Sequence, residues 1–324
     1  LFQSEAAGPQ TGGISPRIRD TAKTLLLIYC SFTAALIAAL WAADMPLFDA
    51  VTHSFSTIAT GGFSLKNGSV GEYNNLAIEL TILVGMLLAG TNFALFHRFK
   101  SGGRGVFWSN PEFRVYILLV AGATLLISTD MILNATHEIG DALRYSSFQV
   151  VAIMTGTGFG TADYEEWSTL SRSLLLMLYF CGGMAGSTTG SMKLIRIMII
   201  VKVVMHEIRI GFRPTLVAPI RLGGSPVADS VVRGILAYSL IFVATVVIGA
   251  MMVAALDPVD LTTALMASLA CVANVGPGLG AGGPTENYGF LSDGAKLVLS
   301  FCMLLGRLEF FSLLSLFVPS FWRR

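Results

Sequence analysis

The feature that most constrains this chain is a succession of six long apolar segments. They lie near residues 24–43, 76–97, 113–133, 170–203, 231–256 and 289–319. About 20 consecutive apolar residues are enough for a helix to cross the hydrocarbon core of a bilayer. Hydrophobic residues make up 54% of the chain and charged residues only 13%, about half the charged share of a soluble domain. The sequence therefore predicts an all-α polytopic membrane protein.

Between the two members of each successive pair of segments lies a shorter apolar stretch that ends in glycines. These stretches read FDAVTHSFSTIATGGFS (48–64), YSSFQVVAIMTGTGFGT (145–161) and TALMASLACVANVGPGLG (263–280). Each is too short to span a membrane, which indicates a re-entrant segment. Placing Gly61, Gly158 and Gly276 in one column aligns the stretches without gaps. We therefore expect repeated hairpins around a central pore, each made of a helix, a re-entrant pore helix, a glycine loop and a second helix.

This repeat divides the chain. A polar cytoplasmic lead-in is predicted at residues 1–20 and a first repeat at 21–99. A cytoplasmic linker at 100–112 leads to a second repeat at 113–203, whose last helix is broken. A second cytoplasmic linker at 204–225 leads to a third repeat at 226–324. The chain opens with LFQSEAAGPQTGG rather than with methionine. We expect the numbering to start partway through a longer protein.

Charge predicts the orientation. The links between repeats and the two chain ends are mostly basic, whereas the side that carries the glycine loops is mostly acidic. An excess of Lys and Arg marks the cytoplasmic side, so the glycine loops are expected to enter from outside. A surface rich in carboxylates raises the local concentration of cations above a pore. Ordinary solvated loops explain the same acidic residues equally well.

Glycine loops at membrane depth need a physical reason. Non-helical backbone is tolerated there only where it is buried in protein or lines a water-filled path. Glycine permits left-handed dihedrals that turn successive carbonyls the same way, and a ring of such carbonyls can replace the hydration shell of a cation. The C-terminal end of the preceding short helix adds partial negative charge. One such loop is also compatible with close helix packing, but three at equivalent places indicate ion conduction.

Five motifs, taken in order, resemble the membrane subunit of the Trk/Ktr/HKT superfamily of potassium transporters, with the bacterial Trk-type branch the most similar. They are HSFSTIATGGFS, TGTGFGTADY, GGMAGSTTGSMKLIRI, ANVGPGLG and LLGRLE. The resemblance runs from about residue 9 to the end. It implies potassium uptake through four helix–pore helix–helix repeats around one pore, in a multi-pass protein of the bacterial inner membrane. It also implies a homodimer and cytosolic nucleotide-binding (NAD- or ATP-type) regulatory subunits.

The resemblance also assigns the selectivity filter, position by position. The K⁺ ligands would be backbone carbonyls of Ala59, Thr60, Gly61, Gly156, Thr157, Gly158, Asn274, Val275 and Gly276. Only three of the four repeats are present, so the fourth is expected either from a further part of a longer protein or from another chain. The loops differ from one another, which makes selectivity for monovalent cations a firmer expectation than selectivity for K⁺ over Na⁺.

The middle of segment 170–203 predicts a second functional element. It reads CGGMAGSTTGS (181–191), a run of poor helix formers, so we expect an intramembrane loop below the filter. Close packing of small residues against a neighbouring helix is the alternative. The resemblance likewise implies a gating loop here. The predicted gate consists of Gly182, Gly183, Gly186, Ser187, Thr188, Thr189 and Gly190 together with Arg307.

Arg307 lies in the last apolar segment, where a charged side chain usually faces a cavity or a partner. We expect it to contact carbonyls and hydroxyls of the 182–191 loop and to raise the barrier to cations, unless it extends to the membrane interface. Glu309 is only two residues away, on a different helix face, and is not its expected partner. Lys193 and Arg196 are expected to extend to the interface instead.

Other functions fit less well. No nucleophile, carboxylate pair or metal-ligand spacing indicates an enzyme, and the four cysteines are expected to be small hydrophobic residues. Reading GTGFG as a nucleotide loop requires a preceding strand and an acidic residue about 20 positions later, which the sequence lacks. We expect no cofactor on this chain, nucleotide being bound only by the regulatory partner. An alternating-access transporter coupled to Na⁺ or H⁺ and a non-conducting receptor or scaffold are the remaining alternatives.

Overall fold

The same helical unit recurs three times in the computed structural model, which describes residues 18–103, 105–212, 219–319 and 322. Each unit has a long helix, a short helix that ends at a glycine loop, and a second long helix that is interrupted. Of the predicted lead-in, only residues 18–20 are described, and they open the first helix. The unit predicted from the sequence is thus present in the structure.

The element bounds are as follows. The first unit comprises α1 (Ile18–Ala42), α2 (Leu47–Ile58), a 3₁₀ turn (Ser69–Tyr73), α3 (Leu76–Ala89) and α4 (Phe93–Gly102), and α5 (Gly105–Ser109) follows. The second comprises α6 (Pro111–Leu133), α7 (Ile139–Met154), a 3₁₀ turn (Tyr164–Glu166), α8 (Thr169–Tyr179) and α9 (Leu194–Phe212). The third comprises α10 (Asp229–Leu256), α11 (Leu261–Ala273), 3₁₀ turns (Gly280–Gly282, Tyr288–Phe290), α12 (Asp293–Arg307), α13 (Phe311–Leu314) and a 3₁₀ turn (Ser315–Phe317).

A two-stranded antiparallel hairpin precedes the third unit. Its strands are β1 (Arg221–Leu222) and β2 (Ser225–Pro226), and Arg221 pairs with Pro226. Helix α9 continues to Phe212, through residues that the sequence analysis placed in a cytoplasmic linker. The remainder of that linker, residues 213–218, lies outside the described part of the chain.

Polar side chains fix where many of the helices begin. Each of these side chains accepts a hydrogen bond from a backbone N–H of the first turn, as expected for an N-cap. They are Asn75, Asn92, Asn110, Ser168, Asp260 and Ser292 at α3, α4, α6, α8, α11 and α12. Pro111 follows Asn110 at the first position of α6, where its missing N–H costs nothing.

All three second helices are interrupted, although the sequence predicted a break only in the second unit. Helices α3 and α4 meet at 91°, and α12 and α13 meet at 107°. Helices α8 and α9 are separated by the loop from residue 180 to residue 193. Among the described residues, three helices are long and apolar enough to cross a membrane, or up to five if each bent pair counts as one span. The chain is a multi-pass membrane protein.

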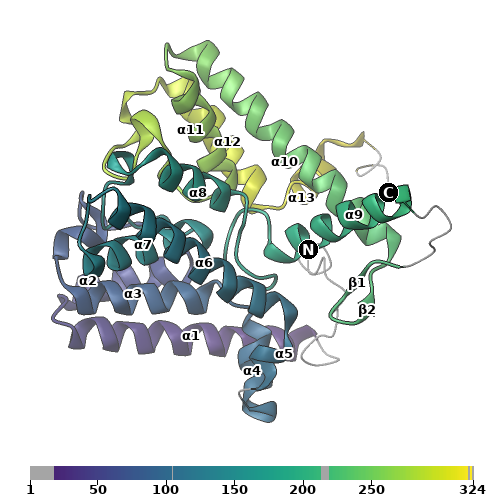
Figure 1. Ribbon diagram of the computed structural model, residues 1–324, viewed down its shortest axis with the longest axis horizontal. Helices are drawn as coiled ribbons and strands as arrows, with labels where there is room; N and C mark the ends of the chain where they lie inside the picture. Colours follow the sequence, from purple (N-terminus) through teal and green to yellow (C-terminus); the bar gives the residue numbers. More distant parts are fainter. Residues whose placement is uncertain (1–17, 104, 213–218, 320–321, 323–324) are drawn as a thin grey trace.

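The units pack side by side through their inner helices. Helix α3 contacts α7, and α8 contacts α11. Figure 1 shows α1 and α3 along one side of the molecule and α10, α11 and α12 along the opposite side, with the loop between α8 and α9 passing between them. The short helices α7 and α11 contribute many of the fully buried residues, so they lie at the centre of the fold.

Candidate functional site

The three glycine loops leave their short helices in the same way. After each helix one residue adopts the left-handed conformation, and the N–H of the next residue bonds to the carbonyl five positions back. The left-handed residues are Thr60 (φ 52°), Gly156 (φ 63°) and Asn274 (φ 57°). The N–H to carbonyl bonds are Gly61 to Ser56 (2.7 Å), Thr157 to Ala152 (2.9 Å) and Val275 to Ala270 (2.9 Å). A glycine with positive φ follows in every loop, at Gly62, Gly158 and Gly276.

This geometry corrects the register of the first loop by one residue. The equivalent of Gly158 and Gly276 is Gly62, not Gly61. Ala59 is the αR cap of α2 and corresponds to Thr155, the αR cap of α7. The gap-free alignment was wrong because it matched positions by glycine identity alone. The equivalent positions are set by the backbone at the helix end, where Thr60, Gly156 and Asn274 share the left-handed conformation.

The loops lie next to one another in chain order. A Cβ built on Gly62 would overlap the carbonyl oxygen of Thr157, and one built on Gly158 would overlap that of Val275. A Cβ on Gly276 would meet nothing within 4 Å. The first loop approaches the second, and the second approaches the third, so closely that only glycine fits. The third loop, at Gly276, faces open space where no described residue lies.

The carbonyls of these loops are mostly free of protein donors. Among the described residues, the carbonyls of Thr60–Gly62, Gly156–Gly158 and Asn274–Val275 accept no hydrogen bond from the protein, whereas that of Gly276 accepts one. Backbone carbonyls in a folded protein are normally paired with protein or water. Successive unpaired carbonyls at the ends of three short helices are suited to coordinate a cation or water.

The segment between α8 and α9 lies against these loops. The Thr60 hydroxyl donates to the carbonyl of Thr188 at 2.9 Å, and the Thr188 hydroxyl donates to the carbonyl of Ile58 at 2.9 Å. A Cβ on Gly190 would lie 2.7 Å from the carbonyl oxygen of Ala273. The segment thus contacts both the first loop and the residues that lead into the third loop.

The other predicted gate residues shape this segment. A Cβ on Gly182 would collide with the carbonyl oxygen of Gly190, and a Cβ on Gly183 would collide with that of Gly90. Gly186 has φ +75°, and its carbonyl accepts the N–H of Phe93 at 3.1 Å. The hydroxyls of Ser187 and Thr189 lie 2.8 Å apart. The break in the helix is therefore a defined loop, and the alternative of a continuous helix with small-residue packing is wrong.

Arg307 contacts this loop, as predicted. Its Nη1 donates to the carbonyl of Thr188 at 3.0 Å, the same oxygen that accepts the Thr60 hydroxyl. The preceding residue, Gly306, lets α12 pack closely against α11, because a Cβ on Gly306 would overlap the carbonyl of Val272 in α11. The carbonyl of Thr188 thus joins the first glycine loop to α12.

The expectations for Lys193 and Arg196 were wrong. Both side chains are buried rather than extended to an interface. The Nζ of Lys193 donates to the carbonyls of Thr189 and Ser187. Arg196 forms an ion pair with Glu309 and lies 4.0 Å from the centre of the Tyr238 ring. Burial favours these partners because a charge withdrawn from water must be compensated.

Glu112 is a residue that the sequence analysis missed. It belongs to the predicted cytoplasmic linker 100–112, yet it is only 4% exposed. One carboxylate oxygen accepts the N–H groups of Ala185 at 2.8 Å and Ile195 at 3.1 Å. Ala185 lies in the loop between α8 and α9, and Ile195 lies in the first turn of α9. An acidic residue just after Asn110 and Pro111 is ordinary at a helix start, so nothing in the sequence marked it as buried.

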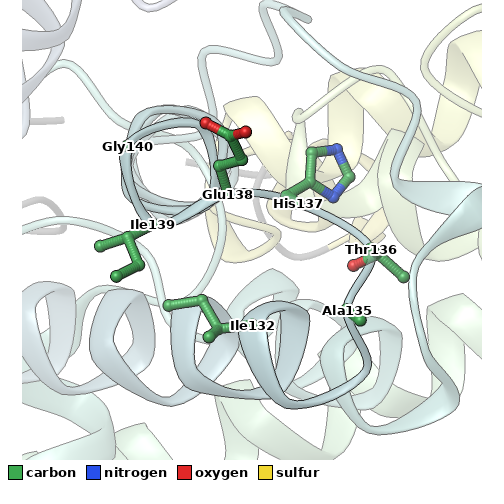
Figure 2. A pocket seen from close by; sticks show the side chains of 7 residues that line it. All are labelled: Ile132, Ala135, Thr136, His137, Glu138, Ile139 and Gly140. Atoms are coloured by element: carbon green, nitrogen blue, oxygen red, sulfur yellow. The ribbon is translucent and has the colours of Figure 1, made fainter.

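A shallow pocket lies elsewhere on the surface (Figure 2). It is lined by residues 132 and 135–140, with the side chains of His137 and Glu138 beside it. These residues precede or open α7, whereas the second glycine loop follows its other end, about 24 Å away at 1.5 Å per residue. Within the described ranges no group of three His, Cys, Asp or Glu side chains is arranged to hold a metal. The glycine loops therefore remain the candidate site.

Comparisons with known proteins agree with this geometry. The whole chain, residues 1–324, matches the family TrkH, described as "Cation transport protein". It is 38% identical to the Trk system potassium uptake protein TrkH of Salmonella typhimurium and 37% identical to that of Escherichia coli K12, covering 100% of this chain and 67% of each relative. It is 32% identical to TrkG of E. coli K12, covering 66% of that protein.

Among solved structures, the crystal structure of the potassium transporter TrkH from Vibrio parahaemolyticus is similar. The TM-score is 0.90 at 38% sequence identity, over 96% of this chain and 67% of that chain. The chain thus spans about two thirds of the length of the relatives it matches.

Proposed function

Because this chain belongs to the TrkH family of cation transport proteins, we propose that it supplies three of the four filter loops of a potassium uptake pore. The family is one of transporters rather than enzymes, and the relatives described above are named potassium uptake proteins. The glycines of GTGFG follow helix α7 rather than a strand, which removes the basis for a nucleotide loop.

The donor-free carbonyls carry this proposal. Three short helices direct their C-terminal ends toward loops whose carbonyls are almost all left without protein partners. Helix dipoles and carbonyl oxygens together stabilise a dehydrated monovalent cation. With the corrected register, the proposed ligands are the carbonyls of Thr60–Gly62, Gly156–Gly158 and Asn274–Gly276. The fourth sector, beside Gly276, would be filled by another part of the full-length protein.

The proposed movement is passive. A membrane potential contributes about 2.3 kcal/mol per elementary charge per 100 mV, which is enough to concentrate K⁺ inside a cell without a coupled ion. The loop between α8 and α9, held by Arg307, is the proposed gate below the filter. A positive charge at that place raises the energy of a passing cation.

The proposed setting follows from the charge pattern and the family. The filter loops would face the periplasm under an acidic surface, in a bacterial inner membrane, with the basic links in the cytoplasm. The name "Trk system" of the relatives indicates a membrane subunit that works with other Trk components. We propose a homodimer regulated by cytosolic nucleotide-binding subunits, with nucleotide bound by those subunits and not by this chain.

The gate can be tested in the full-length protein in liposomes without regulatory subunits. Arg307→Met should raise the basal K⁺ flux by up to about thirtyfold, because two like charges separated by about 8 Å repel by about 2 kcal/mol at an effective dielectric constant of 20. Arg233→Met is the control, since that arginine is exposed on α10 and should leave the flux unchanged.

The outcomes separate the functions. Unchanged flux in Arg307→Met would overturn the gate. Slow, saturating exchange without unitary currents would favour an alternating-access transporter, and absence of flux in every variant would favour a scaffold. Unitary K⁺ currents are the result expected for a pore.

A further inference from the structure

Three tyrosines hold the backbone of the third filter loop. The hydroxyls of Tyr288, Tyr179 and Tyr164 donate to the carbonyls of three consecutive residues, 276, 277 and 278, at 3.0, 2.6 and 2.9 Å. Tyr164 and Tyr179 are fully buried. A buried tyrosine hydroxyl normally needs a hydrogen-bond partner, and here all three partners belong to one short stretch that begins at a filter glycine.

Two of these tyrosines come from the neighbouring unit. Tyr164 lies in the 3₁₀ turn after the second filter loop and Tyr179 at the end of α8, whereas Tyr288 belongs to the third unit itself. Glu165, beside Tyr164, also accepts the N–H of Gly280 and pairs with Arg172 at 3.2 Å. The second unit therefore fastens the outer part of the third loop.

The other two loops lack this arrangement. Within the described residues, the carbonyls of Gly62 and Gly158, which are equivalent to that of Gly276, accept no protein hydrogen bond. The three loops thus differ in how firmly their outermost filter carbonyl is held. The difference depends chiefly on the hydroxyl of Tyr288, which is the one that reaches Gly276.

We propose that Tyr288, supported by Tyr179 and Tyr164, is a positioning residue that sets how strongly the pore discriminates K⁺ from Na⁺. This inference rests on the proposed function. Na⁺ is smaller than K⁺, so a filter accepts it when its carbonyls move inward. The stretch from Gly276 to Gly278 contains two glycines, and Gly276 has φ +101°, so its own backbone resists such movement weakly. The hydrogen bonds from the three tyrosine hydroxyls restrain this inward movement of the carbonyls.

The tyrosines are suited to act as permanent donors. Burial raises the pKa of the Tyr288 hydroxyl above its usual value, and burial likewise raises the pKa of Tyr164. Each hydroxyl therefore keeps its proton at any physiological pH, and the anchoring does not vary with pH.

The test is the K⁺ to Na⁺ permeability ratio of the full-length protein, obtained from reversal potentials under bi-ionic conditions. This ratio does not depend on expression level. Tyr288→Phe should lower it about fivefold, because one hydrogen bond contributes about 1 kcal/mol. Tyr179→Phe should lower it in the same direction. Tyr73→Phe is the matched control, since the Tyr73 hydroxyl donates to a carboxylate oxygen of Asp49 at 2.6 Å and to no filter carbonyl.

The result also separates this inference from the proposed function. A wild-type protein that does not select K⁺ would overturn the proposed function, whatever the tyrosine variants do. A selective wild type whose ratio is unchanged in both Tyr288→Phe and Tyr179→Phe would overturn the inference alone. An equal fall in Tyr73→Phe would also overturn it, because the effect would then follow loss of any hydroxyl near the pore.

Discussion

At the scale of single residues, the site depends on backbone conformation more than on side-chain identity. Thr60, Gly156 and Asn274 are chemically unlike, yet all three adopt the left-handed conformation at the end of a short helix. That conformation is strained for a β-branched residue. The Thr60 hydroxyl donates to the carbonyl of Thr188, a contact that offsets part of the strain and ties the first loop to the gate segment.

Gly158→Ala tests the close approach of the loops. The added Cβ would overlap the carbonyl of Val275, and φ +79° is unfavourable for alanine. We expect K⁺ flux or K⁺ selectivity to be lost in the full-length protein, measured in liposomes. Gly122→Ala is the control, because a Cβ there meets nothing within 4 Å in the middle of α6, where alanine stabilises a helix by about 0.5–1 kcal/mol. Wild-type selectivity in Gly158→Ala would contradict the filter geometry.

At the scale of elements, the interrupted helices matter most. Each break frees backbone groups at membrane depth, where unsatisfied groups are costly. In the second unit, Glu112 takes up two of them, the N–H groups of Ala185 and Ile195. A single carboxylate oxygen on α6 thus fixes both the loop between α8 and α9, at Ala185, and the first turn of α9, at Ile195.

Glu112→Leu should therefore destabilise the protein by about 2 kcal/mol or more, since each buried donor left unpaired costs about 1–3 kcal/mol. The measurement is thermal unfolding in detergent. Glu112→Gln keeps an acceptor oxygen at the same place and should retain most of the stability. Equal melting temperatures for the Leu and Gln variants would show that the two hydrogen bonds contribute little.

At the scale of the whole molecule, partly buried ion pairs join one unit to the next. Arg144 on α7 forms a bidentate pair with Glu79 on α3, with both N–O distances 2.7 Å. Arg196 on α9 pairs with Glu309 at the bend between α12 and α13. Glu309 and Phe310 both have positive φ, and Phe310 packs against Tyr238. The pair thus holds a strained bend against the second unit.

Arg196→Met is expected to cost about 3–5 kcal/mol, because it leaves Glu309, only 15% exposed, without its partner. The double variant Arg196→Met with Glu309→Leu should recover much of this loss, since no unpaired charge remains. Thermal unfolding of the two variants beside the wild type measures both effects. A double variant no more stable than Arg196→Met alone would show that the unpaired Glu309 charge is not the source of the loss.

The sequence by itself determined the repeated unit, its membrane setting, the break in the second unit and the contact between Arg307 and the loop that forms this break. Hydrophobic run length, glycine content and the cost of an isolated charge depend on local composition, so they can be read without coordinates. The resemblance to the family, confirmed by the comparisons, came from the same motifs.

Only the tertiary structure decided which glycine of the first loop is equivalent to Gly158. Gly61 and Gly62 are the same residue type in the sequence and differ only in their backbone conformation and hydrogen bonding. It also decided the burial of Glu112 and Arg196, the bends after α3 and α12, and the tyrosine contacts to the third loop. These features join residues far apart in the chain. Their partners are chosen by packing between units, and no local pattern in the sequence encodes that choice.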